Sequence, residues 1–212
     1  METALFIAHV SSVSVLIPLV LAIIQWGKLP KEIAIIRWIL VFSLILDLTA
    51  FLFVRFSINT HPLGNAYLFI QFACLFYIFS FYNQRKKLLV LVFGIFTVFY
   101  LVNIAFIQGP KEFNTNANVI ASLILIVLSL NFLFSLLNEL SVIHIHRLPI
   151  LWISFAALLY YAATLFIFLA SNLFFQSEDQ SGLTVWILHN FLNIIKNMLF
   201  AVGLWQNFRA QK

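Results

Sequence analysis

The sequence is a series of seven continuously apolar stretches separated by short polar segments. An α-helix needs about 20 residues to cross a hydrocarbon core about 30 Å thick. The stretches lie at about 4–26, 33–54, 63–82, 88–107, 118–137, 149–171 and 183–205. They do not show the alternation of apolar and polar residues that marks the strands of a membrane barrel. The pattern predicts an all-α membrane protein in which residues 1–212 form one bundle of seven transmembrane helices.

The composition agrees with this fold class and excludes a soluble globular protein. Of the 212 residues, 63% are hydrophobic and 9% are charged, against about 45–50% and about 25% in soluble domains. The gaps between the apolar stretches are about 5 to 12 residues long, which is too short for a catalytic domain in water. We therefore expect no enzymatic activity.

The basic residues of the polar segments are strongly biased to one side of the predicted membrane. Short cytoplasmic loops retain lysine and arginine. One side holds nine basic residues, namely Lys28, Lys31, Arg37, Arg85, Lys86, Lys87, Arg147, Arg209 and Lys212, and the other holds Arg55 and Lys111. The bias predicts that the N-terminus is outside and the C-terminus is in the cytoplasm. The acidic loop at Glu178 and Asp179 is then external.

The net charge of +5 would suggest nucleic acid as the partner of a soluble protein. Here the basic residues stand at helix ends, where anionic lipid headgroups lie. We expect membrane lipids as partners, with anionic headgroups at the cytoplasmic loops, and no nucleic acid. The single cysteine, Cys74, falls within the third apolar stretch. It excludes an intramolecular disulfide and a cysteine-based metal site.

Two ionisable residues lie deep inside the predicted helices. A charge at the bilayer centre costs at least about 2.5 to 3.5 kcal/mol. Lys196 lies about 3 Å to the cytoplasmic side of the centre of helix seven, and Asp47 about 5 Å to the outer side of the centre of helix two. The depth difference of about 8 Å is within reach of the two side chains together. The pair is either a neutralised strut between helices or part of a binding or coupling site.

Lys196 belongs to a polar stripe on helix seven. His189, Asn193, Lys196 and Asn197 follow the i, i+4, i+7, i+8 spacing of one helix face. Such residues can join helices by hydrogen bonds worth about 1 kcal/mol each. Asn190 lies next to this stripe. Because these four polar residues and a charge exceed what packing usually needs, we favour a polar cavity.

Other helices offer residues at similar depth. Ser43 shares a face with Asp47, Gln71 with Tyr67, and Tyr161 with Thr164. His9 and His189 lie at a common depth and would meet if helices one and seven adjoin. Without a close ligand motif, the sequence predicts no metal site. The predicted ligand-binding residues are Lys196, Asp47, His189, Asn193, Asn197, His9, Gln71 and Tyr161.

The segments from Trp186 to Asn197 and from Leu151 to Ser154 resemble a group of small uncharacterised bacterial seven-helix membrane proteins, which implies the fold and no activity. In size and topology the chain is also similar to the seven-helix sensor modules of bacterial histidine kinases. That resemblance implies a sensor with a cytoplasmic signalling partner.

A lysine in the middle of helix seven also resembles the microbial rhodopsins. This resemblance implies retinal on Lys196 with Asp47 as counterion. The sequence departs from the family because helix three has no acid, helix six lacks the tryptophan and tyrosine-proline pattern, and position 192 is leucine. Seven-helix zinc hydrolases carry His-x-x-x-His on the last span, where this chain has His189 and Asn193. We expect no cofactor.

These residues predict a sensor or receptor-like membrane protein that binds a small ligand or ion without a covalent bond. The polar intramembrane pocket is expected to open toward the outer face. A small secondary transporter is the alternative. A further alternative is a retinal-binding photoreceptor or pump through Lys196.

Overall fold

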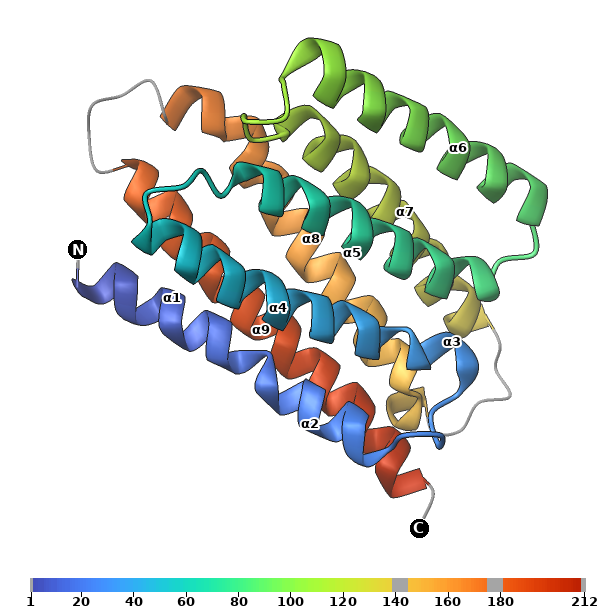
Figure 1. Ribbon diagram of the computed structural model, residues 1–212. Helices are drawn as coiled ribbons and strands as arrows, with labels where there is room; N and C mark the ends of the chain where they lie inside the picture. The colour runs from blue at the N-terminus through green and yellow to red at the C-terminus, as the bar shows by residue number, and fades with distance from the viewer. Residues whose placement is uncertain (1, 139–144, 175–180, 211–212) are drawn as a thin grey trace.

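The computed structural model describes residues 2–138, 145–174 and 181–210, and these residues form helices joined by short connections (Figure 1). All seven predicted helices are present, and each is long and apolar enough to cross a membrane. The helical segments are α1 (Glu2–Ser14) with α2 (Leu16–Ile24), α3 (Lys31–Ala34) with α4 (Ile36–Arg55), α5 (His61–Phe81), α6 (Lys86–Val102) with the π-helix η1 (Asn103–Ile107), α7 (Thr115–Asn138), α8 (Pro149–Phe174) and α9 (Ser181–Ala210). A short 3₁₀ helix, η2 (Ile145–Arg147), precedes α8. The predicted loop at Glu178 and Asp179, and Lys212, lie outside the described residues.

The first of the seven membrane-length segments is interrupted at Val15, between α1 and α2. Pro18 explains the interruption, because proline has no backbone N–H to donate to the carbonyl of Ser14. Val15 itself keeps helical dihedral angles, with φ −63° and ψ −24°. The direction of the segment is therefore little changed, and α1 and α2 act as one span.

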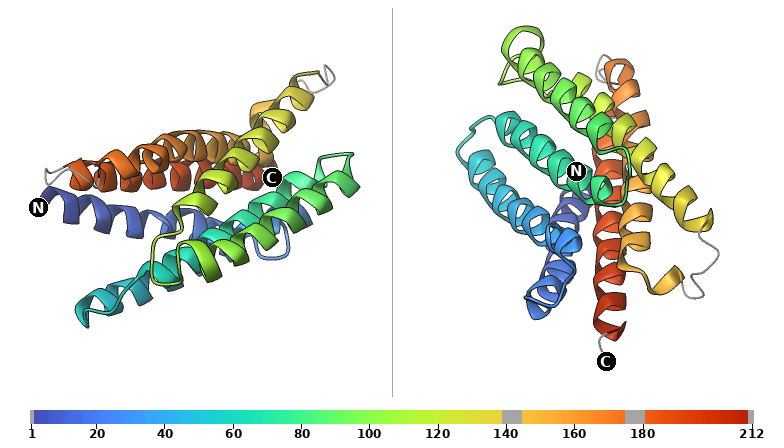
Figure 2. Two further views of the ribbon diagram at one scale, coloured as in Figure 1. Left: turned by 90° about the horizontal axis from the view of Figure 1, so that it is seen from above. Right: turned by 90° about the vertical axis from the view of Figure 1, so that its right-hand side faces the viewer.

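The packing of the helices closes into a ring of six spans. In this ring α1 and α2 pack on α9, α9 on α8, α8 on α7, α7 on α5, α5 on α4, and α4 on α2. The α6 helix lies at the edge of the bundle, against α5 and α7 (Figure 1). Figure 2 shows the same arrangement from above and from the side. The ring makes the first and last spans neighbours and leaves the fourth span outside.

The closest helix pair is α8 and α9, and Gly203 makes the approach possible. A Cβ atom at position 203 would lie 2.9 Å from the carbonyl oxygen of Pro149 and 3.2 Å from Cβ of Trp152. Small residues let membrane helices approach each other in this way. The last two spans therefore form a tight pair, which fixes the position of the polar face of α9.

Candidate functional site

Three side-chain hydrogen bonds join α9 to the first span, which is formed by α1 and α2. The amide nitrogen of Asn193 donates to Ser11 Oγ at 2.9 Å, and that of Asn197 donates to Ser14 Oγ at 2.8 Å. Near the other end, Asn207 Nδ2 donates to Oε1 of Gln25 at 2.7 Å. In each of these hydrogen bonds the two partners are 182 or 183 positions apart in the sequence. The constant separation shows that the two spans run parallel. We call these six residues the seam.

Gln25 is the most completely bonded member of the seam. Its side chain has a relative exposure of 0%. Its Oε1 accepts from Asn207, and its Nε2 donates to the carbonyl oxygens of Leu204 at 2.9 Å and Leu21 at 3.1 Å. A buried amide that is bonded on both its oxygen and its nitrogen has no remaining need for a ligand. Gln25 therefore acts as a structural link between α2 and α9.

The seam changes the interpretation of Asn193 and Asn197. Both were predicted to line a polar cavity, but their amide nitrogens are used in hydrogen bonds between helices. The structure thus favours helix joining over cavity lining for these two residues. The physical reason is that α9 directly contacts α1 and α2, whose serines face it.

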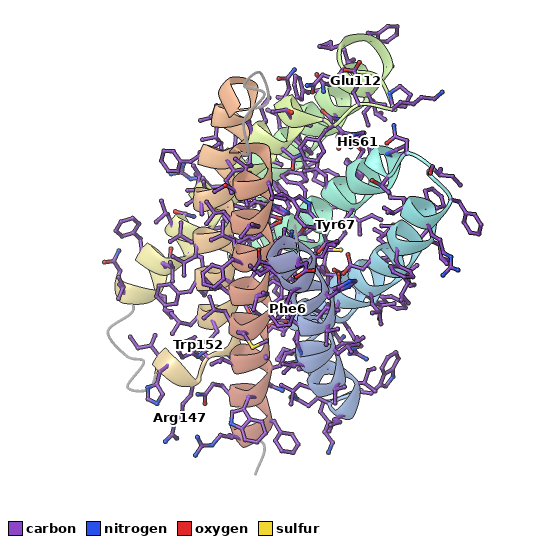
Figure 3. The ribbon with its side chains drawn as sticks, turned by 90° about the vertical axis from the view of Figure 1, so that its left-hand side faces the viewer. Phe6, His61, Tyr67, Glu112, Arg147 and Trp152 are labelled. Atoms are coloured by element: carbon purple, nitrogen blue, oxygen red, sulfur yellow. The ribbon has the colours of Figure 1, made fainter. Side chains whose placement is uncertain are left out.

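Lys196 lies inside the bundle, as predicted, with a relative exposure of 2%. Its Nζ lies 4.4 Å from the ring centroid of Tyr160 on α8 and 5.9 Å from that of Tyr67 on α5. Figure 3 shows Tyr67 at mid-height in the bundle. No hydrogen-bond acceptor reaches Lys196 Nζ in the part of the chain that the structure describes. Two aromatic faces surround the ammonium group in place of an oxygen partner.

Asp47 does not form the predicted ion pair with Lys196. Its carboxylate is half-buried on α4 and close enough to act on Lys196 electrostatically, yet no ion pair joins the two among the described residues. The reason is the order of the ring, because α4 packs on α2 and α5 while α9 packs on α1, α2 and α8. Asp47 therefore contributes a field to the site, and the predicted direct contact is wrong.

Gln71 is another buried donor without a partner among the described residues. It lies one helical turn after Tyr67 on α5 and has a relative exposure of 3%. Among the described residues, nothing accepts a hydrogen bond from its Nε2. Tyr161 is also buried, and its ring lies 5.1 Å from that of Tyr160. We call Lys196, Tyr160, Tyr67, Gln71 and Asp47 the Lys196 core.

The predicted histidines are not brought together. His9 is exposed on α1, whereas His189 is half-buried on α9 with its ring 5.8 Å from that of Tyr160. His9 stands two residues before Ser11, which is about 200° around the helix. Because Ser11 faces α9, His9 faces away from it. Among the described residues, no group of three His, Cys, Asp or Glu side chains could hold a metal ion.

The sequence interpretation did not include Tyr160 among the binding residues, although its ring is the nearer of the two aromatic rings to Lys196 Nζ. It selected Tyr161, which follows Tyr160 in the chain and lies on the same helix at about 100° of rotation. Both tyrosines are buried on α8. The only signal in the sequence was the adjacent tyrosine pair near the centre of the span, and helical spacing alone could not choose between them.

A second polar network, also missed, lies where α5, α6 and α7 meet. Asn65, Asn103 and Asn114 are all buried. Asn103 Nδ2 donates to Asn114 Oδ1 and to Gln108 Oε1, the latter at 2.8 Å, and Asn65 Nδ2 donates to the carbonyl of Glu112 at 2.9 Å. The bonds fasten the connection between α6 and α7 to three helix ends. The asparagines at 114, 116 and 118 were the available signal.

In the Lys196 core, the contacts of Lys196 do not offset the free-energy cost of burying its ammonium group. A cation over an aromatic face gains about 2 kcal/mol when it is desolvated. Removing an ammonium group from water costs several kcal/mol in a real protein. The aromatic faces therefore offset only part of the cost at Lys196. The site has an excess of hydrogen-bond donors, which suits a group that supplies acceptor oxygens.

Comparison of the chain with family models, curated proteins and solved structures finds no match.

Proposed function

We propose that this chain is a receptor-like multi-pass membrane protein that binds a small ligand carrying acceptor oxygens, such as a carboxylate, at the Lys196 core. One observation carries the proposal: two buried donors, Lys196 Nζ and Gln71 Nε2, have no acceptor among the described residues. An unmade hydrogen bond of a buried donor costs about 1 to 3 kcal/mol, and more when the donor is charged. A bound carboxylate would recover part of that free energy.

Asp47 provides a way to link binding to a change in the helices. In the absence of ligand, Lys196 lies in the field of Asp47 and between two tyrosine rings. A ligand carboxylate on Lys196 would repel the carboxylate of Asp47. Since Asp47 is on α4 and Lys196 is on α9, the repulsion would favour a different spacing of these helices. Such a difference in interaction between two states is what a receptor requires.

The proposal is tested by ligand-dependent stabilisation of the purified protein. Acetate, succinate and chloride are added separately, and the melting temperature is measured in detergent. We expect a carboxylate to stabilise the unmodified protein and to have no effect on Lys196→Met. Lys87→Met, which removes an exposed lysine, is the matched control and should respond like the unmodified protein. Equal shifts in Lys196→Met and the unmodified protein would exclude Lys196 as the binding group.

The same carboxylates can be used to test whether the protein is a transporter. A transporter reconstituted in proteoliposomes should accumulate the radiolabelled carboxylate, whereas a receptor should bind it without moving it. Addition of all-trans retinal provides a further check. A visible band that Lys196→Met abolishes would replace the receptor with a retinal protein.

We propose that the protein lies in a bacterial cytoplasmic membrane with its N-terminus outside. The support is the predicted bias of nine basic residues against two. In a Cys74→Ala background, cysteine is placed separately at Lys111, Arg85 and Arg209. An impermeant thiol reagent added to intact cells should label position 111 and spare 85 and 209. Labelling at 85 would reverse the proposed orientation.

A further inference from the structure

A basic cavity lies at one end of the bundle, far from the Lys196 core. Its volume is about 530 Å³, and it is lined by His146 and Arg147 of η2 and by Gln206 and Arg209 of α9. Within the described residues, no acidic side chain forms an ion pair with either arginine. Two arginines, one from η2 and one from α9, therefore line the same cavity.

A second cavity lies between α7 and α8 and is apolar. Its volume is about 490 Å³, and its lining includes Leu130, Leu133, Leu137, Leu151 and Phe155. His146 lines this groove as well as the basic cavity. A charged space and an apolar groove therefore meet at one residue.

Both cavities belong to the same end of the helices. The C-terminal ends of α7 and α9 and the N-terminal end of α8 lie together in Figure 1. Figure 3 shows Arg147 and Trp152 near this end, and Trp152 Nε1 donates to the carbonyl of His146 at 2.8 Å. From Leu137 to Leu130 the groove runs about 10 Å along α7, at 1.5 Å per residue. The groove thus extends from the basic end toward the middle of the bundle.

We propose that these two cavities form a binding site for one anionic phospholipid. The phosphate lies between Arg147 and Arg209, and one acyl chain follows the groove between α7 and α8. Arginine matches phosphate oxygens in geometry and charge. A phospholipid carries a phosphate that glycerol joins to long apolar chains, so its charged and apolar parts are adjacent in the same way as the two cavities. The inference does not depend on the Lys196 core.

The headgroup part is tested by native mass spectrometry of the full chain in detergent, with dioleoyl phosphatidylglycerol as the probe and dioleoyl phosphatidylcholine as the comparison. Each arginine near an anionic headgroup is expected to contribute about a fivefold difference in affinity. Arg147→Gln with Arg209→Gln should weaken binding of phosphatidylglycerol about 25-fold and weaken phosphatidylcholine much less, because the choline ammonium group already neutralises its phosphate. The control, Arg85→Gln with Lys87→Gln, removes the same charge at exposed positions outside the cavity. An equal loss in the control would show a general charge effect and overturn the site.

The acyl part is tested by filling the groove. Leu133→Trp, or Leu137→Trp if the first variant folds poorly, should weaken phosphatidylglycerol while leaving inorganic phosphate unaffected. Leu123→Trp is the control, because Leu123 is exposed on α7 and is not among the groove residues. If inorganic phosphate binds as tightly as phosphatidylglycerol and the groove variants change nothing, the ligand is a free anion and the lipid proposal is wrong.

Discussion

Two glutamines, Gln25 and Gln71, are buried to nearly the same degree, with relative exposures of 0% and 3%. Gln25 accepts from Asn207 and donates to two backbone carbonyls. Nothing among the described residues accepts from Nε2 of Gln71. Burial therefore does not separate a structural polar residue from a candidate ligand-binding one. The difference lies in whether each donor has an acceptor.

The same contrast holds for the two regions to which these glutamines belong. In the seam, Asn193 and Asn197 of α9 each have a serine partner on the first span. In the Lys196 core, Lys196 of the same helix has two aromatic rings near its Nζ and no hydrogen-bond acceptor among the described residues. One helix thus carries a satisfied set and an unsatisfied set of polar groups within four residues. Substitutions in the two sets should have opposite effects on stability.

The largest effect is expected for Lys196→Met. Lys196→Met removes a desolvation penalty of several kcal/mol and loses about 2 kcal/mol of cation–aromatic attraction, which leaves a net gain of about 1 to 4 kcal/mol. We expect the free energy of unfolding in mixed detergent micelles to rise by that amount. Lys87→Met should change it by no more than about 0.5 kcal/mol, as exposed substitutions usually do.

Asp47→Asn tests whether Lys196 lacks a direct ion-pair partner. A direct buried pair would make the loss of one partner cost about 3 to 5 kcal/mol. Since no ion pair joins Asp47 and Lys196 among the described residues, we expect the free energy of unfolding to change by less than about 1 kcal/mol. A loss of the larger size, or destabilisation by Lys196→Met, would show that Lys196 is paired and would remove the contrast between the regions.

The two glutamines provide a matched pair of equal substitutions. Gln25→Leu leaves Asn207 without its acceptor and should lower the free energy of unfolding by about 1 to 3 kcal/mol. Gln71→Leu removes an unpaired amide and should be neutral or stabilising, because an unsatisfied buried donor is lost. Denaturation of both variants in the same detergent measures the difference. Equal losses would mean that Gln71 has a partner and is structural.

A smaller effect is expected in the seam at Asn197. Hydrogen bonds between membrane helices contribute about 0.6 kcal/mol on average and about 1.7 kcal/mol at most. Asn197→Ala should lower the free energy of unfolding within that range. Asn190→Ala is the control, because Nδ2 of Asn190 donates to the carbonyl of Trp186 on its own helix at 2.9 Å. If both variants lose the same free energy, the bond from Asn197 to Ser14 does not join the helices.

Among the substitutions that remove a hydrogen bond, the smallest effect is expected at Tyr82, which lies just beyond the end of α5. Its hydroxyl donates to Oε1 of Glu32 at 3.1 Å. Partial burial, followed by the nearby Glu32 carboxylate, raises the pKa of Tyr82 above its ordinary value. Tyr82→Phe should cost about 0.5 to 1 kcal/mol.

The pH dependence of this bond has a definite sign. Because the folded protein holds the Tyr82 proton more tightly, the contribution is complete below about pH 10 and is lost as the pH rises above it. The difference in unfolding free energy between the unmodified protein and Tyr82→Phe should therefore shrink at alkaline pH. A difference that grows with pH would show that the hydroxyl is not the donor.

The sequence by itself determined the seven helices, because bilayer thickness sets the length of each apolar stretch, and the structure confirms all seven. It also determined that Lys196 is buried, since a charge deep in a span is too costly in lipid. The polar stripe of α9 followed from its spacing. These features depend on local composition and period, which a sequence displays directly.

The tertiary structure alone decided which side chains meet. It turned His9 away from α9, separated Asp47 from Lys196 by the order of the ring, placed Tyr160 under the ammonium group instead of Tyr161, and gave Asn193 and Asn197 to the seam. The physical reason is that lipid tails are as apolar as a protein core. An apolar helix in a membrane therefore shows no pattern that tells its buried face from its lipid face, and its rotation and neighbours are fixed only when the helices pack.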